Sequence, residues 1–386
     1  MKFNGYIRSD GHVGIRNHVV VMPGVICAAG VAQKIANQVK GAQYLYNPNG
    51  CAQNSSDTAI TLEILSGLIA NGNVFGVLIV GLGCEMIRED KYLEAIRKKT
   101  DKPVYYISIQ KEGGINKTVE KGKEIVNTLI KESSKCVRKE CDLSELILGL
   151  ECGGSDPTSG FSANAVLGNT SDRIVDLGGT TILCETPEAI GTEHILKSRG
   201  KTPEIGQKLY DTIIKFDQMF KNNGEDIRKT NPSPGNKASG ITTLEEKSLG
   251  CIHKSGTRPF SGVYEYGQMV DKKGLMFMDG TAYDVASVVS LVAGGAQMVA
   301  FTTGMGTPVG NALVPVIKIT GNNDTATRLE DMIDFDTSSS ISGTKSVEEL
   351  GKELLDYMVR VCNGEEVKAE INNISDMAIN QFYSYA

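Results

Sequence analysis

Three cysteines lie next to glycine at the ends of apolar segments, at Cys51, Cys84 and Cys152. Thiolates are soft ligands, so three that converge could bind iron or zinc, or hold three corners of an iron–sulfur cluster with one iron open. None of them has CxxC spacing, and most free cysteines are small buried thiols. The pattern therefore leaves a metal centre and ordinary buried thiols as alternatives.

Carboxylates follow the same kind of apolar segment, at Glu85, Asp156, Glu185 and Glu188. Such a side chain can bind a divalent metal or transfer a proton. Each of them alone is more commonly a helix cap or a surface charge. As a set at strand ends they favour a site, and we expect Glu85 to be a catalytic residue beside the metal.

Lysines are frequent in the polar segment 223–262. A lysine can neutralise a substrate carboxylate, or act as a base when it is desolvated. Lys247 has apolar neighbours, whereas a solvated loop charge is the better interpretation for Lys254. We expect Lys247 and Glu246 to supply the base or the acid, and Lys237 to bind substrate.

Hydroxyl, amide and carboxylate side chains also follow the predicted strands. The strand pattern at 146–150 breaks into a glycine-rich turn and then resumes as a helix, which is where α/β proteins bind ligands. These groups suit an oxygen-rich ligand such as a polyhydroxy acid. The expected substrate-binding residues are Ser155, Asp156, Asn164, Thr302 and Thr303. No P-loop is present and no GxGxxG follows the first strand, so a nucleotide is disfavoured.

These residues need strands and helices to position them, and the hydrophobic pattern supplies an alternation of the two. Short β-branched runs predict strands at 18–23, 42–46, 74–81, 103–109, 145–150, 180–183, 296–301 and 313–319. Helical spacing predicts helices at 24–39, 57–70, 88–99, 116–134, 203–222, 282–294 and 346–362. The fold class is therefore α/β, with mostly parallel sheets flanked by helices, similar to a Rossmann fold without its nucleotide motif.

The length of 386 residues predicts two domains. We place their boundary in the polar stretch 131–142, which gives domains at 1–138 and 139–386. The segment 223–262 lacks periodicity and is interpreted as a functional cover or a linker.

The overall composition excludes several classes of function. Charged residues make up 22% of the chain and the net charge is −6, so no basic surface points to nucleic acid. No apolar run is long enough to span a membrane. The nine cysteines are scattered without disulfide spacing, which favours a reducing cytoplasm. We therefore expect a cytoplasmic protein that acts on a small molecule.

With these motifs in view, the chain resembles the galactarate/altronate dehydratase family. The matching segments are GYIRSDGHVGIRNHVVVMP, NGC at 49–51, VGLGCE at 80–85, LECGGSDPTSGFSAN at 150–164, LCETPEAIGTE at 183–193, PSPGNK at 232–237, GITTLEEKSLGC at 240–251 and FTTGMGTPVG at 301–310. The resemblance implies a lyase that removes water from a sugar acid such as altronate to give a 2-keto-3-deoxy acid, supported by Fe²⁺ or Mn²⁺. His12 and Met305 stand where many members carry arginine.

The resemblance also implies partners. Longer members carry a small β-rich N-terminal domain that this sequence lacks, so the chain resembles the large subunit of a split, oligomeric enzyme with a separate small subunit. The related sulfolactate sulfo-lyase has the same arrangement and releases sulfite. Three hypotheses follow: a sugar-acid dehydratase, a sulfolactate sulfo-lyase, and a non-catalytic subunit that binds sugar acids. For the enzymes we expect Cys51, Cys84 and Cys152 to hold the metal or an iron–sulfur cluster.

Overall fold

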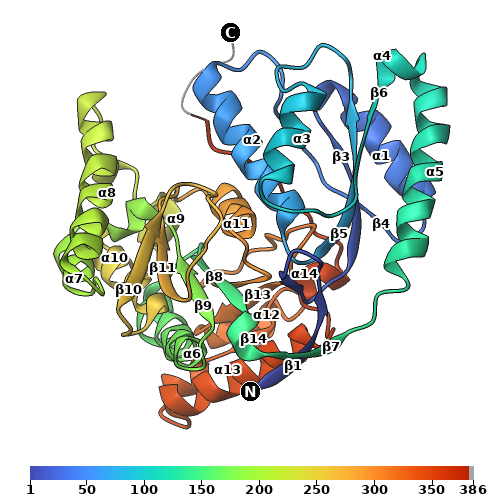
Figure 1. Ribbon diagram of the computed structural model, residues 1–386. Coiled ribbons are helices and arrows are strands. Elements are labelled where there is room, and N and C mark those ends of the chain that lie inside the picture. The colour runs from blue at the N-terminus through green and yellow to red at the C-terminus, as the bar shows by residue number, and fades with distance from the viewer. Residues whose placement is uncertain (382–386) are drawn as a thin grey trace.

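The apolar runs of the sequence form two separate parallel sheets with helices on their faces (Figure 1). The computed structural model describes residues 1–381. One sheet has four strands in the order β4-β3-β5-β6, and the other has seven in the order β10-β11-β9-β8-β12-β13-β14. Every neighbouring pair in both sheets is parallel. The predicted α/β class is confirmed.

The four-stranded sheet is buried on both faces. Its strands are β3 (His18–Pro23), β4 (Ala42–Tyr44), β5 (Val74–Gly81) and β6 (Val104–Ser108). The elements between and after them are η1 (Ile26–Ala28), α1 (Ala29–Gln38), α2 (Ser55–Ala70), α3 (Glu89–Arg97), α4 (Ile109–Glu112) and α5 (Ile115–Ser133). Along β3, Val19 and Val21 enter one apolar cluster while Val20 and Met22 enter another. Alternation along a strand that is apolar on both sides explains this two-sided burial.

The seven-stranded sheet carries the C-terminal part. Its strands are β8 (Ile147–Cys152), β9 (Thr180–Leu183), β10 (Phe260–Tyr264), β11 (Gly274–Met278), β12 (Met298–Thr302), β13 (Val316–Thr320) and β14 (Phe335–Asp336). Outside the segment 223–262, the α-helices of this part are α6 (Asn164–Asp176), α7 (Glu193–Ser198), α8 (Pro203–Asn222), α11 (Asp284–Ala293), α12 (Asn323–Arg328), α13 (Val347–Cys362) and α14 (Lys368–Ile371). Single turns occur at η2 (Leu143–Glu145), η3 (Ser159–Ala163), η4 (Thr186–Ala189) and η7 (Ser338–Ser340).

The segment 223–262 is not the irregular loop that we expected. It contains η5 (Ile227–Lys229), α9 (Pro234–Ala238), α10 (Leu244–Ile252) and η6 (His253–Ser255). These helices are too short to show periodicity, and they begin at side-chain caps, Ser233 for α9 and Thr243 for α10. The segment packs over the seven-stranded sheet, because the Asn236 amide donates to the Ser155 carbonyl at 2.9 Å.

A third, antiparallel sheet ties the beginning of the chain to its middle. It contains β1 (Lys2–Ile7), β2 (Val13–Gly14) and β7 (Lys139–Asp142), with β1 in the centre. The expected domain boundary at 138/139 falls directly before β7. No helix among the described residues is long and apolar enough to cross a membrane.

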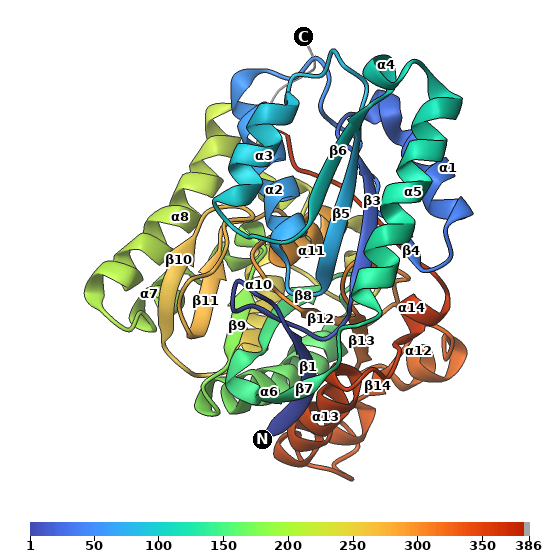
Figure 2. The same ribbon diagram turned by 45° about the vertical axis from the view of Figure 1, so that its right-hand side comes forward.

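The two parallel sheets meet through α2 and α11, which pack against each other (Figure 2). A Cβ added to Gly67 of α2 would lie 2.5 Å from the carbonyl oxygen of Ala293 at the end of α11. Glycine at this position therefore allows the close approach of the two helices.

We expect the substitution Gly67→Ala to lower the free energy of unfolding by about 1–3 kcal/mol, because the added methyl group forces α2 and α11 apart. Urea unfolding measures the change. Gly30→Ala in α1 is the control, since a Cβ there meets nothing within 4 Å and alanine should stabilise the helix by about 0.5–1 kcal/mol. Equal effects of the two substitutions would contradict this packing.

Candidate metal and active site

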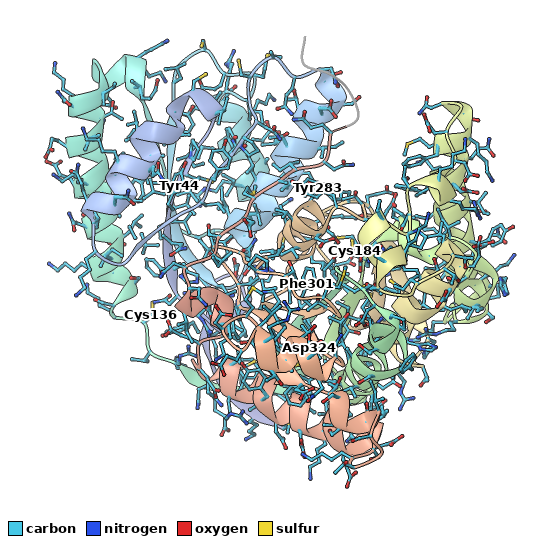
Figure 3. All side chains as sticks on the ribbon, turned by 180° about the vertical axis from the view of Figure 1, so that it is seen from behind. Tyr44, Cys136, Cys184, Tyr283, Phe301 and Asp324 are labelled. Atoms are coloured by element: carbon cyan, nitrogen blue, oxygen red, sulfur yellow. The ribbon has the colours of Figure 1, made fainter. Side chains whose placement is uncertain are left out.

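Three central strands of the seven-stranded sheet, β9, β8 and β12, bring functional residues to one edge. Cys152 is the last residue of β8, Glu185 follows β9, and Thr302 is the last residue of β12. β9 lies on one side of β8, and the later strand β12 lies on its other side. The strand order therefore reverses at β8, which makes this edge a topological switch point. In Figure 3, the labelled Cys184 and Phe301 mark the strand ends that lead into Glu185 and Thr302.

Four buried ligand groups converge at this edge. One ligand atom from each of Cys152, Glu185, Glu188 and Cys251 lies within 4.8 Å of all the others. The Cys152 sulfur is 3.6 Å from a Glu185 carboxylate oxygen and 3.8 Å from both a Glu188 oxygen and the Cys251 sulfur. Four different elements, β8, the turn after β9, η4 and α10, supply them.

The chemistry of this donor set fits a divalent metal. Two thiols and two carboxylates combine soft and hard ligands, which suits ferrous iron better than an ion that prefers only oxygen, such as manganese. Burial raises the pKa of Glu185 to about 7, against the opposing charge of Lys254, and the pKa of Cys152 lies well above its usual range because of Cys251 and burial. A cation between these groups would stabilise their charged forms.

Two lysines accompany the ligands on one face of α10 and η6. Lys247, Cys251 and Lys254 follow one another at helical spacing. The Lys247 amine is 2.5 Å from a Glu188 oxygen and 3.1 Å from the Asn231 side-chain oxygen. Burial opposes the charged form, but the Glu188 carboxylate raises the pKa of Lys247 above its usual value, so Lys247 is present as the ammonium.

Lys254 is completely buried and forms an ion pair with Glu185. This corrects the interpretation of Lys254 as a solvated loop charge. The sequence pattern missed it because the segment was interpreted as irregular, whereas η6 turns the side chain inward. A buried lysine is stable only when it is paired, so Lys254 and Glu185 depend on each other.

Glu185 has a left-handed backbone, with φ of 72°. This conformation is unfavourable for a non-glycine residue, by about 1–3 kcal/mol, and persists only when the surroundings enforce it. Here the Lys254 ion pair and the Cys152 N–H, which donates to a Glu185 oxygen at 3.1 Å, hold the side chain in place. The strain is therefore associated with the convergence of the ligand groups.

Two cavities open beside the ligand groups. One of about 220 Å³ is lined by Cys152, Cys251 and Ser155, and the other of about 450 Å³ by Glu188 and Asp284. Lys247 lines both of them. It is therefore the site cation that can reach a bound molecule, whereas Lys254 is enclosed.

The residues expected to bind substrate oxygens do come together at this edge. The Thr302 hydroxyl donates to the Asn164 amide oxygen at 2.6 Å, and an Asp156 oxygen accepts from Asn322 at 2.9 Å. The Thr303 hydroxyl accepts from the backbone of Gly306. These contacts join β12, α6 and the turn after β8.

Among the substrate-binding candidates, Ser155 differs in having a free hydroxyl. Ser155 is buried and lines the smaller cavity, and its hydroxyl oxygen makes no hydrogen bond to any described residue. Of the expected residues it is thus the one with an unused polar atom next to a cavity.

The expected group of Cys51, Cys84 and Cys152 does not form within residues 1–381. Cys152 is buried, whereas Cys51 and Cys84 are exposed, and the metal-capable group of the described residues contains neither of them. The physical reason is that Cys51, Cys84 and Glu85 follow strands of the four-stranded sheet, which has its own carboxyl edge. Cys152 follows a strand of the seven-stranded sheet, so the three cysteines do not share one edge.

Two other candidates lie apart from the ligand groups. Glu246 is exposed and its carboxylate accepts hydrogen bonds from Thr242, although it lies at the rim of the smaller cavity. Lys237 is exposed and lines neither cavity. Neither position favours the expected role over a structural one.

Cys251 was missed by the sequence-based analysis, and Glu185 and Glu188 were considered without being chosen. The signal that could have found Cys251 is the pattern Thr243-x-x-Glu246, which is typical of a helix start. The helix α10 does begin there, with Thr243 as its cap. Once a helix is predicted there, the spacing of four residues between Lys247 and Cys251 places both on one face of it.

A crevice at a switch point between parallel strands is where open α/β sheets bind small molecules. Comparison with known proteins identifies the family. Residues 5–134 match the D-galactarate dehydratase/altronate hydrolase second domain, and residues 143–385 match the D-galactarate/altronate dehydratase C-terminal domain. The chain belongs to the D-galactarate/altronate dehydratase family and is a lyase of the dehydratase type.

Three relatives are similar over most of their length. The altronate dehydratase of Bacillus subtilis (strain 168) is 35% identical over 387 residues, covering 98% of this chain and 77% of that protein. The galactarate dehydratase (L-threo-forming) of Escherichia coli (strain K12) is 32% identical, covering 94% and 73%. The (2R)-sulfolactate sulfo-lyase subunit beta of Chromohalobacter salexigens is 32% identical, covering 100% and 98%.

Proposed function

We propose that this chain is the large subunit of a metal-dependent dehydratase that removes water from a sugar acid such as altronate and produces a 2-keto-3-deoxy acid. The observation that carries the proposal is the group of Cys152, Glu185, Glu188 and Cys251, which lies next to two cavities and to the paired Lys247. The names of the altronate and galactarate dehydratase relatives support the substrate class.

The reaction needs two proton transfers. A base removes the proton at C2, the C3–O bond breaks as its hydroxyl receives a proton and leaves as water, and the resulting enol tautomerises to the ketone. A ferrous or manganous ion held by the four ligand groups would withdraw charge from the substrate carboxylate and acidify the C2 proton. The protein must supply the base and the acid.

Lys247 and Asp284 are the residues we assign to these transfers. The Lys247 ammonium lines both cavities and can donate a proton to the leaving hydroxyl, after which its partner Glu188 holds the neutral amine in place. Asp284 lines the larger cavity together with Lys247 and can accept the proton from C2. We assign Ser155 to bind a substrate oxygen, because its hydroxyl has no partner among the described residues and it lines the smaller cavity.

We expect kcat/KM to rise with pH through about 6 or somewhat below. Burial and the nearby Glu188 carboxylate raise the pKa of Asp284 to about 6, and a bound cation lowers such a value. The carboxylate form is the active base, so activity is lost as the pH falls through this pKa. The Asp284→Asn variant should lose most of the activity, and its remaining kcat/KM should no longer fall at acid pH. The pH–rate profiles of the wild type and of this variant measure the change. An unchanged acid limb in Asp284→Asn would rule out this role.

The second candidate is a sulfolactate sulfo-lyase. The observation in its favour is that the chain covers 98% of a relative named as subunit beta of that enzyme. Its substrate is also a 2-hydroxy acid, and the same removal of the C2 proton would release sulfite from C3. Sulfite leaves without receiving a proton, so this reaction would not need the acid function that we assign to Lys247.

Product analysis distinguishes the candidates. The anaerobically purified protein, supplied with ferrous iron, is assayed with altronate, galactarate and (2R)-sulfolactate for 2-keto acid and for sulfite. We expect 2-keto acid from a sugar acid and no sulfite from sulfolactate. Sulfite release would support the second candidate, and no product from any of the three would indicate a non-catalytic subunit.

A separate small subunit and an oligomeric assembly belong to the proposal. The match to a relative named as a subunit supports them. Isolation of the untagged protein from its own cells tests this, because a small subunit should elute with it in a fixed ratio. Full activity of the chain without any second polypeptide would overturn the split arrangement.

A further inference from the structure

A buried lysine away from the proposed active site lacks an ionic partner. Three of the described lysines are buried, Lys102, Lys254 and Lys318. Lys254 forms an ion pair, and the Lys102 ammonium donates to two backbone carbonyls at 2.5 and 2.6 Å. The Lys318 ammonium donates to one described group, the Val316 carbonyl at 3.2 Å, and pairs with no described carboxylate. An ammonium has three N–H donors, so two of them are left for a ligand.

Lys318 occupies a core-facing position of β13. Ile317 and Ile319 belong to the apolar cluster that includes residues of α13, and the alternation of a strand places Lys318 on the opposite face, together with Val316. The helix α14 packs against the same strand (Figure 1). Charged side chains are seldom fully buried unless they are paired, so this position calls for a counter-charge.

A cavity of about 250 Å³ lies beside this lysine. Its polar lining residues are Lys318, Lys368, Asp331 and Asn372, and the other lining residues are apolar. Its volume is below the range of about 300–1,000 Å³ that is usual for drug-sized ligands, so the cavity suits a small ion or a small acid.

The lining has more positive than negative charge. Like Lys318, Lys368 forms no ion pair with a described carboxylate, whereas Lys345, for example, does. Asp331 is the one carboxylate of the lining, and it is exposed. Two lysines and one carboxylate leave an excess positive charge at the cavity.

Two further carboxylates act on the Lys318 ammonium from a distance, and both are bound to backbone groups. One Asp334 oxygen accepts the Lys318 N–H at 2.7 Å and the other accepts the Lys368 N–H at 2.8 Å, while Asp376 accepts the Gly310 N–H at 3.1 Å. Burial lowers the pKa of Lys318 to about 8, and Asp334 and Asp376 oppose this shift. At neutral pH the side chain is therefore an ammonium that the protein stabilises incompletely.

The turn after β12 borders both this cavity and the proposed active site. Pro308 lines the cavity beside Lys318, whereas Met305 lines the larger cavity beside Glu188. None of the four proposed metal ligands lines the cavity beside Lys318. A ligand bound there lies outside the proposed reaction, although it contacts the same turn.

We propose that the cavity beside Lys318 binds a small oxyanion, through a carboxylate or phosphate group, with Lys318 and Lys368 as its cationic ligands. An ammonium is a compact charge with several donors, which suits the oxygens of either group. The bound anion supplies the counter-charge that Lys318 lacks. The proposal does not depend on the dehydratase activity.

The test uses the full chain and two probes, inorganic phosphate and lactate, at an ionic strength held constant with sodium chloride. Isothermal titration calorimetry measures their binding to the wild type and to Lys318→Met. We expect saturable binding of at least one probe, weakened about tenfold or more in Lys318→Met, because a hydrogen bond to a charged group contributes about this factor. Binding of phosphate alone, of lactate alone or of both supports the proposal and identifies the oxyanion that the site accepts.

Lys352→Met is the matched control, because Lys352 is an exposed lysine of α13 that does not line the cavity. It should bind the probes as the wild type does. Lys368→Met keeps the proposal falsifiable if Lys318→Met fails to fold, since Lys368 is only half-buried, and it should also weaken binding. No binding of either probe to the wild type, or equal binding by the wild type and the two cavity variants, would overturn the proposal. Turnover is not measured, so this test and that of the dehydratase fail independently.

Discussion

Replacing Cys152 by alanine is expected to lower kcat by about a thousandfold and to remove one iron per chain. Cys152 is the ligand at the centre of the proposed metal site, with three other ligand groups within 3.8 Å of its sulfur. A metal that acidifies a C–H bond contributes several kcal/mol to catalysis, and each 1.36 kcal/mol corresponds to a factor of ten. Steady-state kinetics and metal analysis of the anaerobic protein measure both effects.

Cys184→Ala is the matched control for this substitution. Cys184 is equally buried at the end of the neighbouring strand β9, and its sulfur contacts the Ser290 hydroxyl at 3.6 Å instead of the ligand group. The Cys184→Ala substitution should weaken packing, while the iron content per chain and kcat stay within a few-fold of the wild-type values. Equal losses in both variants would mean that Cys152 acts through packing and not as a ligand.

Replacing Lys247 by methionine is expected to lower kcat by about 10²–10⁴-fold and to leave the metal bound. Methionine keeps most of the apolar stem but cannot donate a proton to the leaving hydroxyl, and general acid catalysis contributes a factor of this size. The Lys247 side chain is 11% exposed and lines both cavities, so it can reach the substrate without a rearrangement of α10.

Lys237→Met provides the comparison for the Lys247 variant, because Lys237 is an exposed lysine of the same segment that lines neither cavity. Its kinetics should match those of the wild type. A Lys247→Met protein with unchanged kcat and a raised KM would show that Lys247 only binds substrate, which would refute its role as the acid.

The long apolar or strongly periodic elements could be predicted from the sequence. The strands at 18–23, 74–81 and 180–183 and the helix at 203–222 were predicted with the bounds that the structure shows. These segments are determined by local patterns, either β-branched runs that are buried on two faces or an amphipathic helix with a proline start. The domain boundary before β7 remains an interpretation of the polar composition.

The edge strands and the short helices could not be predicted in the same way. The segments of β10 and β11 contain glycine and have polar neighbours in the sequence, so their pairing is decided by tertiary contacts, of β10 with β11 and of β11 with β9. α10 has only nine residues, and its helix start was not recognised at Thr243. Because α10 and the turn after it position Cys251 and Lys254, neither residue was assigned to the site from the sequence.

The site itself was predicted in part. The residue types at the strand ends can be read from the sequence, whereas the convergence of these residues depends on the tertiary structure. Asp156, Asn164 and Thr302 do meet, as the shared edge of β8 and β12 requires. Cys51 and Cys84 were expected to converge with Cys152, although the expected boundary at 138/139 places their strands in another domain than the strand before Cys152. The glycine-rich turns after β5 and β8 look alike although they belong to different sheets.

The most direct test of the central claim is the X-ray absorption spectrum of the anaerobically purified protein loaded with one ferrous iron per chain. We predict two sulfur neighbours at about 2.3 Å together with oxygen neighbours, from Cys152, Cys251, Glu185 and Glu188. A first shell of oxygen and nitrogen alone, or of sulfur alone, would contradict the proposed metal centre.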